Sequence, residues 1–491
     1  MHRLGRIALG LSVVVLALAA VVIVRTIAFQ GPELADTRGV KLAAPVAVDV
    51  ALAARHLSEA VQIPTVSHQD EALDQPAQWT RLQDFLTTAY PAAHAAMTRE
   101  IVGRKTLVYT WKGAEPSLAP IVLMAHQDVV PVTEGTEGDW KHPPFSGAIA
   151  EGAVWGRGSI DDKGSLITLF EGVEILAKQG FRPRRTVILV SGEDEEVRGS
   201  GARAAAALLR TRGVKAQFVL DEGLAVIADD PITHRRVALI GTAEKGYGTL
   251  MVTARAEGGH SSAPPADGGG VATLARAVTA IAERGYPMRF SGPGAAMVSA
   301  LAAKGTFPVR MAAANLWLFR PLLIRQIGAT PVGASLLHTT IAPTMLQGSP
   351  KENVLPQDAT AWINYRFAPG DTAWSAIGRA QKAVGRGSVA IAWAKPPLEP
   401  SPVSSTTSEG WRTLAAVAGA VTGAPVVPGL VTAGTDSRYL QPVATDVYRF
   451  QPMELSLTGI AMIHGTNEHM TLRNLETAVQ FYARLIATAA G

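Results

Sequence analysis

The stretch GRGSIDDKGSL, residues 156–166, combines three glycines, two adjacent aspartates and a lysine between an apolar run and a segment with helical periodicity. This pattern predicts that Asp161 lies where a strand is followed by a helix, with Gly158 and Gly164 allowing a tight backbone turn. A carboxylate at such a strand end suits a bridge between metal ions better than a surface role. Gly-Asp-rich loops are common, so this interpretation depends on four further acidic or histidine clusters in the chain.

Strand and helix patterns alternate around this stretch. The predicted strands are 106–112, 121–125, 186–190 and 218–220. The predicted helices are 48–60, 79–90, 165–179 and 201–212. Strands that run into acidic turns and then into helices indicate an α/β domain with a mostly parallel sheet, and ligands at the C-terminal edge of its strands.

The pattern changes near Gly241. Strands at 249–256, 359–367 and 389–393 and helices at 270–284 and 372–384 predict a smaller α+β lid or dimerisation domain inserted in the first. The expected organisation is a membrane anchor or signal segment (1–29), a linker (30–47), a catalytic domain in two parts (48–241 and 398–491) and the lid (242–397), which contains a long insert (285–345).

Composition narrows the functional classes. The chain has 491 residues, of which 47% are hydrophobic and 18% charged, which is typical of globular proteins. Its formal net charge of +4 is small for this length, and no nucleic-acid-binding motif accompanies it. There are no cysteines, so any metal ion must bind to His, Asp and Glu.

The N-terminus predicts a membrane segment. His2, Arg3 and Arg6 precede an apolar run from Ile7 to Val24. This run is close to the roughly 20 residues that span a bilayer, and its basic flank predicts a cytoplasmic N-terminus and an exported remainder. A cleaved signal peptide is the alternative, although no A-x-A-like cleavage site is evident.

Two of the clusters offer imidazoles. In MAHQDVVPV, residues 124–132, His126 and Asp128 are two apart at a predicted strand end and point the same way. A carboxylate that orients the second nitrogen of a histidine ligand is a usual arrangement, although a strand-end histidine bonded to a neighbour is the simpler interpretation of this pair alone. In IHGTNEHM, residues 463–470, His464 offers a second imidazole.

Two further clusters offer carboxylates. GEDEEVRGSG, residues 192–201, follows a predicted strand, and a solvated turn is the alternative interpretation of such an acidic run. A site with two zinc ions needs one carboxylate on the metal and one free to take a proton, and the adjacent Glu195 and Glu196 can supply both. LDEGL, residues 220–224, adds Asp221 and Glu222.

In their order along the chain these motifs resemble the M20 family of dizinc metallopeptidases, which includes aminoacylase-1, carnosinase and carboxypeptidase S. The motifs that carry the resemblance are MAHQDVVPV, GRGSIDDKG, DEEVRGSGA, LDEG, GGHSSAPP, GTDSRY and IHGTNE, within residues 50–485. The chain is most similar to the carboxypeptidase S branch, which includes enzymes that make and cleave N-fatty-acyl amino acids.

The resemblance implies a site for two zinc ions, although cobalt or manganese suits the same donors. Asp161 would bridge the two ions, and Asp128 would orient His126. Asp221 is preferred to Glu222 because relatives keep an acid directly after this strand. The implied ligands are His126, Asp161, Glu196, Asp221 or Glu222, and His464.

The resemblance also implies catalytic and substrate-binding residues. Glu195 would be the general base, and His260 in GGHSSAPP would stabilise the oxyanion, in some relatives across a dimer interface. Asn353 in ENVLP would lie near the substrate. Arg438 in GTDSRY would pair with the substrate's α-carboxylate, for which a guanidinium fork is well shaped.

The expected enzyme is a zinc-dependent, membrane-anchored hydrolase with a metal-bound hydroxide as nucleophile. It would cleave amide bonds of N-acyl amino acids or small peptides with a free carboxylate, and the same site could run the reverse condensation. A dipeptidase or carboxypeptidase and a non-catalytic metal-dependent binding protein are the alternatives. A homodimer is compatible with the lid, and no nucleic acid is expected as a partner.

The apolar segment 310–327 within the insert has two interpretations. It is a helix packed on the lid, or a surface that enters the membrane or lines a groove for a fatty acyl chain.

Overall fold

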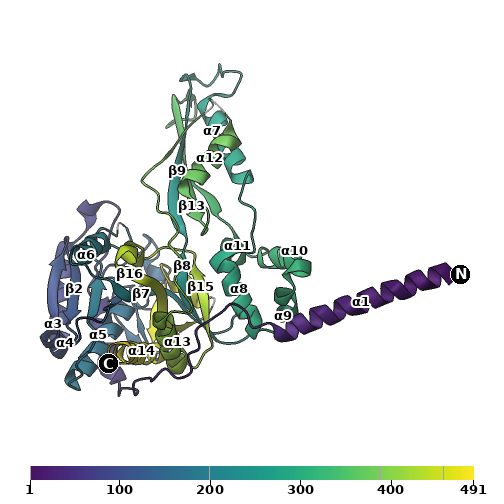
Figure 1. The fold of residues 1–491 in the computed structure, drawn as a ribbon. Helices are drawn as coiled ribbons and strands as arrows, with labels where there is room; N and C mark the ends of the chain where they lie inside the picture. The colour runs from purple at the N-terminus through teal and green to yellow at the C-terminus, as the bar shows by residue number, and fades with distance from the viewer. Residues whose placement is uncertain (1, 198, 386, 388, 457) are drawn as a thin grey trace. The chain divides into compact units, whose positions relative to one another are not determined.

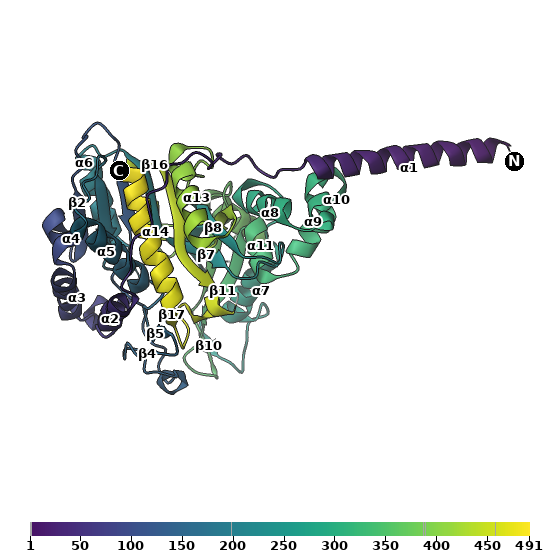
Figure 2. The same cartoon turned by 90° about the horizontal axis from the view of Figure 1, so that it is seen from below.

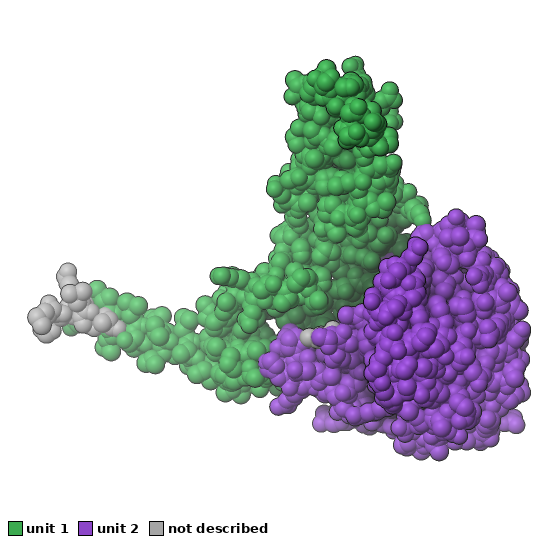
Figure 3. Space-filling view, turned by 180° about the vertical axis from the view of Figure 1, so that it is seen from behind, with its two compact units in different colours: residues 1–32, 243–402, 430–434 green, residues 33–242, 403–429, 435–491 purple. Residues whose placement is uncertain are grey.

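The computed structural model describes residues 2–491 apart from positions 198, 386, 388 and 457. The chain divides into two compact units, which Figure 3 shows in different colours. Unit 1 comprises residues 1–32, 243–402 and 430–434; unit 2 comprises residues 33–242, 403–429 and 435–491. Each unit has its own hydrophobic core.

A mixed eight-stranded sheet forms the centre of unit 2, with only the ends of β8 and β15 assigned to unit 1 (Figure 1). In order across the sheet its strands are β1 (Thr98–Val102), β2 (Thr106–Trp111), β6 (Val187–Ser191), β3 (Ile121–Met124), β7 (Ala216–Ile227), β16 (Ala444–Leu455), β8 (Val237–Glu244) and β15 (Val426–Val431). The neighbours β6, β3, β7 and β16 are parallel, whereas β2 runs antiparallel to β1 and β6, and β8 runs antiparallel to β16 and β7. The predicted α/β class is confirmed, with its parallel ladders in the middle of the sheet.

Helices cover both faces of this sheet because its strands alternate between two cores. Tyr109 and Leu123 contribute to one core, and their neighbours Val108 and Val122 contribute to the other. On the first face α5 and α14 pack against each other, as Figure 2 also shows. The helices of the first face are α2 (Val50–Val61), α3 (Pro76–Ala89), α4 (Pro91–Ala96), α5 (Lys163–Lys178), α13 (Glu409–Thr422) and α14 (Leu472–Ala490). The second face is covered by α6 (Ser200–Thr211) and the 3-10 segment η3 (Asp436–Val443).

A small three-stranded sheet completes unit 2. Its strands are β17 (His469–Thr471), β5 (Ala153–Trp155) and β4 (Ile149–Ala150), in that order. The pairing of β17 with β5 joins the end of the motif IHGTNEHM to the chain just before GRGSIDDKG. Two of the motifs that the sequence singled out are therefore neighbours in space.

Unit 1 contains a four-stranded antiparallel sheet. Its strands, in order, are β11 (Thr340–Gln347), β13 (Asp358–Phe367), β9 (Gly246–Arg255) and β14 (Ala390–Trp393). The helices α7 (Gly269–Glu283) and α12 (Ala373–Val384) share a core with this sheet. The short strands β10 (Gly259–His260) and β12 (Val354–Leu355) pair separately. This is the α+β pattern expected from the sequence.

The insert in unit 1 is helical, with α8 (Gly292–Lys304), α9 (Phe307–Ala314), α10 (Leu316–Ile327) and α11 (Pro331–Leu337). The single helix expected over 310–327 is wrong, because the chain breaks at Asn315 into two helices. The N-terminal helix α1 (His2–Ala28) belongs to the same unit. Its segment Leu9–Ala28 is long and apolar enough to cross a membrane.

Candidate active site

Segments that leave the C-terminal ends of parallel strands converge at one edge of the unit 2 sheet. His126 follows β3, and Glu195 and Glu196 follow β6. Glu222 lies within β7, and Asp161 lies just before α5. Because parallel strands end at the same edge, side chains that are far apart in sequence come together there, as expected for α/β folds.

Asp128 fixes the orientation of His126, which is buried. His126 Nδ1 lies 3.0 Å from the Asp128 carbonyl oxygen and 3.2 Å from its carboxylate Oδ1. The same carboxylate accepts hydrogen bonds from the Ser67 hydroxyl (2.6 Å) and from the backbone N–H groups of Glu195 (3.1 Å) and Glu196 (3.2 Å). Asp128 therefore holds the turn after β6 in place as well as the imidazole. The sequence analysis missed Ser67.

Asp161 lies between the two imidazoles. Its Oδ1 is 3.0 Å from His126 Nε2, and its Oδ2 is 3.1 Å from His464 Nε2. His464 Nε2 is also 3.1 Å from Glu196 Oε1. The predicted neighbours His126, Asp161, Glu196 and His464 are thus brought together, with His464 on the more exposed side of the cluster.

Glu222, and not Asp221, lies with His126 and Asp161. Asp221, the acid preferred from the sequence, is buried beside this group, and its Oδ2 accepts the backbone N–H of Ser437 at 2.8 Å. The choice between Asp221 and Glu222 as the ligand therefore stays a prediction. The predicted strand 218–220 actually continues to Ile227 and contains a bulge. Arg449 of β16 pairs with Asp221 and the next residue, Phe450, pairs with Leu224, so that Glu222 and Gly223 are extra residues in β7. Gly223 has a φ of 137°, which a glycine adopts readily.

The donor atoms suit two cations that share Asp161. One group of atoms within 4.8 Å of one another comes from His126, Asp161 and Glu222, and a second comes from Asp161, Glu196 and His464. A third group, from His126, Glu195 and Glu196, makes Glu195 an alternative donor. Imidazole and carboxylate donors in such sets fit zinc, cobalt or manganese.

The electrostatics of the cluster also call for added positive charge. Burial raises the pKa of Glu196 to about 7 and the pKa of Glu195 and Glu222 well above the usual range, and neighbouring carboxylates add to each increase. The hydrogen bonds to Asp161 and Glu196 raise the pKa of His464 to about 10. For His126, burial favours the neutral ring, but Asp128 and Asp161 still raise its pKa. Raised pKa values of both carboxylates and imidazoles mean that the cluster, when deprotonated, carries an excess of buried negative charge. Bound cations would neutralise this charge in place of the protons.

A buried ion pair joins the loop of Asp161 to the loop of His464, and the sequence analysis missed it. Glu468 Oε2 accepts a hydrogen bond from Arg157 Nη1 at 2.7 Å, and its Oε1 accepts from the backbone N–H groups of Ile160 (2.8 Å) and Asp161 (3.1 Å). Arg157 Nη2 donates to the carbonyl oxygens of His464 (3.2 Å) and Gly465 (3.0 Å). Both side chains of the pair are at most 2% exposed. The pair therefore sets the distance between two candidate ligands.

The glycines of the opening stretch serve two purposes. Gly158 has a φ of 87°, as its predicted role in a turn requires. Gly164 has an ordinary backbone, but a Cβ atom there would lie 2.3 Å from the Ser159 carbonyl oxygen, so it allows a close backbone approach instead. Asp162, also missed, accepts hydrogen bonds from the His126 backbone N–H (3.1 Å) and from Gln451 (2.9 Å).

The remaining predicted residues lie in two places. Arg438 is half-buried in η3 of unit 2, next to Ser437, which bonds to Asp221. His260 and Asn353 belong to unit 1, where the Ser261 N–H donates to the Asn353 carbonyl oxygen at 3.1 Å. His260 Nδ1 accepts the backbone N–H of Ser262 at 3.2 Å, so in the neutral ring the proton lies on Nε2. His469 stacks on Trp155 and is not among the candidate metal donors of the described chain.

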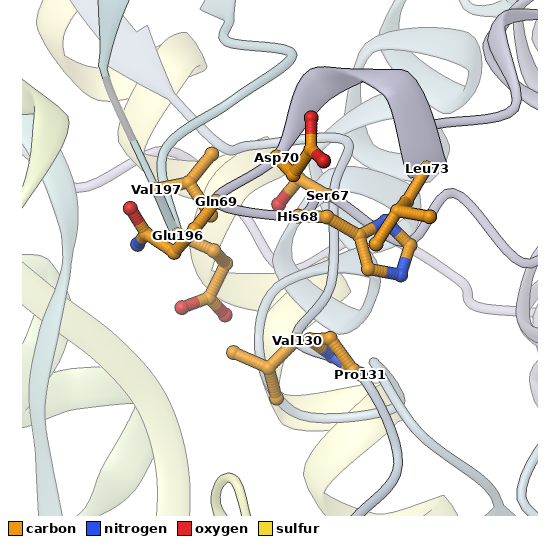
Figure 4. A pocket seen from close by; sticks show the side chains of 9 residues that line it. All are labelled: Ser67, His68, Gln69, Asp70, Leu73, Val130, Pro131, Glu196 and Val197. Carbon is orange, nitrogen blue, oxygen red and sulfur yellow. The ribbon is translucent and has the colours of Figure 1, made fainter. Parts of the chain in front are cut away.

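A cavity of about 480 Å³ lies beside Glu196 in unit 2. Its apolar lining comes from Leu73, Val130, Pro131 and Val197. Figure 4 shows the Glu196 carboxylate on one side of this space and Leu73 on the opposite side. Its size is within the range of small-molecule sites.

Comparison with known proteins identifies the family. The pattern of the peptidase family M20/M25/M40 matches residues 122–488. The chain is 35% identical over 438 residues to the N-fatty-acyl-amino acid synthase/hydrolase PM20D1 of Xenopus tropicalis (88% of this chain, 84% of that protein). It is 34% identical over 445 residues to the probable carboxypeptidase S-like 2 of Dictyostelium discoideum (89% and 85%).

A solved structure shows the same fold. The M20 family metallo-carboxypeptidase Sso-CP2 from Sulfolobus solfataricus superimposes with a TM-score of 0.63 at 16% sequence identity, covering 88% of this chain and 98% of that one. The fold and the site define a metal-dependent hydrolase. This chain belongs to the M20/M25/M40 peptidase family, as the motifs led us to expect.

We predict that Glu468→Gln weakens both the fold and metal binding. The substitution leaves the buried Arg157 guanidinium without a carboxylate, which should lower the free energy of unfolding by about 3–5 kcal/mol. Because it also loosens the Asp161 and His464 loops, metal affinity should fall about 10–100-fold. Urea unfolding and competition with a chelator measure the two effects.

The matched control is Glu151→Gln, which breaks the solvent-exposed pair with Lys141. It should leave the unfolding midpoint and the metal affinity unchanged, since exposed ion pairs contribute little. If Glu468→Gln behaves like this control, the buried pair does not position the ligands.

We predict that metal binding at pH 7 releases protons. His464 with a pKa of about 10 and Glu196 with a pKa of about 7 hold protons that a cation must displace, and so do His126 and Glu222, whose pKa values are also raised. More than one proton should therefore be released per protein. Affinity should therefore rise as the pH is raised from 6 to 9, because fewer protons compete. Calorimetric titration of the metal-free protein in two buffers of different ionisation enthalpy gives the number.

The variant Glu196→Gln lacks one of these groups and should release fewer protons than the parent. Equal heats in both buffers would contradict the prediction.

Proposed function

We propose that this chain is a zinc-dependent hydrolase that cleaves the amide bond of N-acyl amino acids with a free carboxylate. The observation that carries the proposal is the pair of donor groups that share Asp161, with Glu195 beside them. The similarity to an N-fatty-acyl-amino acid synthase/hydrolase supports this substrate class. The same site could run the reverse condensation.

Bound at these donors, two zinc ions would supply Lewis acidity toward the amide carbonyl and toward a water molecule. Glu195 would accept the proton of the attacking water and deliver it to the leaving amine. Its position suits this role, since its backbone N–H is fixed by Asp128 and burial raises the pKa of its carboxyl group well above the usual range. A carboxylate with a raised pKa is a stronger base for the proton of a water molecule.

Three further residues would bind the substrate and its oxyanion. Arg438 would pair with the α-carboxylate, and Asn353 would bind nearby, since its Oδ1 is buried with no hydrogen-bond partner among the described residues. His260 would donate from Nε2 to the oxyanion, because Ser262 occupies its Nδ1.

The cavity beside Glu196 would receive the apolar acyl part of the substrate. Leu73, Val130, Pro131 and Val197 offer it an apolar wall next to a candidate metal ligand. Removing an apolar chain from water against such a wall favours binding by about 25 cal/mol per Å² of buried surface.

We also propose that the helix α1 anchors the enzyme in a membrane, with both units exported. Its candidate span Leu9–Ala28 and the basic residues before it support this orientation. A second function, carboxypeptidase activity on small peptides, is favoured by the similarity to the carboxypeptidase S-like protein.

We expect a panel of three substrates to separate the two functions. Oleoyl-Phe should be hydrolysed in preference to acetyl-Phe and Ala-Phe, because only its chain fills the apolar cavity, and chelation should abolish activity on all three. Preference for Ala-Phe would favour the peptidase function. No turnover of any substrate by the metal-loaded protein would refute both.

Leu73→Ser tests the cavity within the same panel. It should lower kcat/KM for oleoyl-Phe by about 10-fold, because Leu73 is 60% exposed and a bound acyl chain would bury its side chain, and it should leave acetyl-Phe unchanged. Equal loss on both substrates would mean that the cavity does not receive the acyl chain.

Glu195→Gln should lower kcat by about 10²–10⁴-fold, because the amide cannot accept the proton of the water. Metal content, measured by elemental analysis, should stay at the parental value. The control is Glu134→Gln, in an exposed loop, which should retain full activity. Loss of metal from Glu195→Gln would instead assign Glu195 as a ligand, as the third group of donors allows.

A further inference from the structure

The last turns of α1 are fixed to the junction between α9 and α10, within unit 1. The buried Asn315 donates from Nδ2 to the Val22 carbonyl oxygen (3.2 Å) and to the Thr26 hydroxyl (3.3 Å). Arg25 Nε donates to the Ala314 carbonyl oxygen at 3.3 Å. Thr26 is only 1% exposed. Figures 1 and 2 both show α9 and α10 beside the C-terminal end of α1.

This contact sets the depth of α10 relative to the candidate span. The span ends at Ala28, and Asn315 contacts Val22 and Thr26. With a rise of 1.5 Å per residue, these contacts lie about 3–9 Å inside the end of the span. If α1 crosses a bilayer, the start of α10 is therefore at the boundary between headgroups and acyl chains.

The surface of α10 has the side chains that this depth requires. Trp317, Leu318 and Leu322 are 55%, 44% and 56% exposed, and Leu323 is the buried residue of the helix. The three exposed side chains lie on one side of the helix, since their spacing places them within about 140° of arc. Phe307, at the start of α9, is 51% exposed as well.

The segment between Glu283 and Glu352, which contains α10, carries only positively charged side chains among its Lys, Arg, Asp and Glu positions. Between Glu283 and Glu352 the sequence contains no Asp or Glu. The cationic residues in this interval are Arg284, Arg289, Lys304, Arg310, Arg320, Arg325 and Lys351. Arg320 and Arg325 are exposed on α10 itself. Exposed apolar side chains together with arginines are typical of helices that lie in the surface of an anionic membrane.

We propose that α10, with Phe307, lies in the surface of the anionic bilayer that α1 spans, as a second membrane contact. α1 and α10 would then hold unit 1 to the membrane at two points. Of the two interpretations of segment 310–327, this proposal takes membrane entry, because the depth of α10 follows from its contacts with α1. A bound acyl chain or a second copy of the protein would be the other occupants of this face.

The absence of cysteine allows single-site labelling of the full-length chain. Trp317→Cys and Leu318→Cys place a label on the proposed contact. Trp374→Cys is the matched control, because Trp374 is 84% exposed on α12 of the same unit. Each variant carries an environment-sensitive nitrobenzoxadiazole label and is reconstituted in vesicles of phosphatidylcholine with phosphatidylglycerol. The unfolding midpoint of each variant is compared with that of the parent, so that only folded variants are used.

Labels at 317 and 318 should lie about 5–10 Å into the headgroup and acyl boundary, with quenching by nitroxide lipids and slow reduction by aqueous dithionite. The label at 374 should be reduced rapidly and escape the lipid quencher. Shielding at 317 and 318 should weaken in vesicles of phosphatidylcholine alone, and unchanged shielding there would refute the role of the arginines. Rapid reduction at 317 and 318 would overturn the proposal, and so would shielding from dithionite without lipid quenching, which would indicate coverage by protein or substrate.

Discussion

Asp161 is the residue on which the site depends, because its two carboxylate oxygens face the two imidazoles of the cluster. The hydrogen bonds from His126 and His464 lower its pKa although burial opposes this, so it remains charged. Around it, Glu195, Glu196 and Glu222 have raised pKa values, because burial and their mutual repulsion disfavour their charged forms. Two cations would relieve this repulsion, so metal binding and the stability of this edge of the sheet are coupled.

The geometry of this cluster is maintained by groups that are not candidate ligands. Asp128 connects His126 to the turn after β6. Glu468 and Arg157 connect the loop before α5 to the loop of His464, across 311 positions of sequence. These bonds are buried and charge-assisted. Removing one partner of such a bond would leave the other charge buried without compensation and would lower the free energy of unfolding. The donors are thereby held near one another before any metal binds, so little reorganisation is required.

Unit 1 combines two surfaces of different chemistry. The strands β10 and β12 carry His260 and place it next to Asn353, where polar groups are left available. The helices α9 and α10 carry apolar and cationic groups and are fixed to α1. A membrane contact close to the end of α1 would suit an enzyme whose proposed substrates carry fatty acyl chains, since such substrates partition into bilayers. The insert would then keep the enzyme at the surface where its substrate is concentrated.

The sequence by itself determined the α/β class, the α+β nature of the insert, the N-terminal apolar helix and most of the residues at the site. Strand and helix periodicity predicted thirteen elements, from the helix that became α2 to the strand that became β14, because these elements are amphipathic or bounded by glycine and acidic turns. It did not predict β16, which lies in the centre of the sheet although it is near the end of the chain. Long-range strand order is not encoded in local periodicity.

Only the tertiary structure decided which of two adjacent acids faces the metal donors. Asp221 and Glu222 are adjacent in sequence, and Glu222 lies with His126 and Asp161 where β7 contains a bulge, which exists because β16 pairs with both sides of it. The break at Asn315 has a similar cause, since this side chain is buried against α1, almost 300 positions earlier. The partnership of Arg157 and Glu468 also required the fold, because a charged residue has no sequence signal for burial until its partner is brought to it. Residue types determined the chemistry available to this protein, and contacts between distant segments determined which of those residues are used.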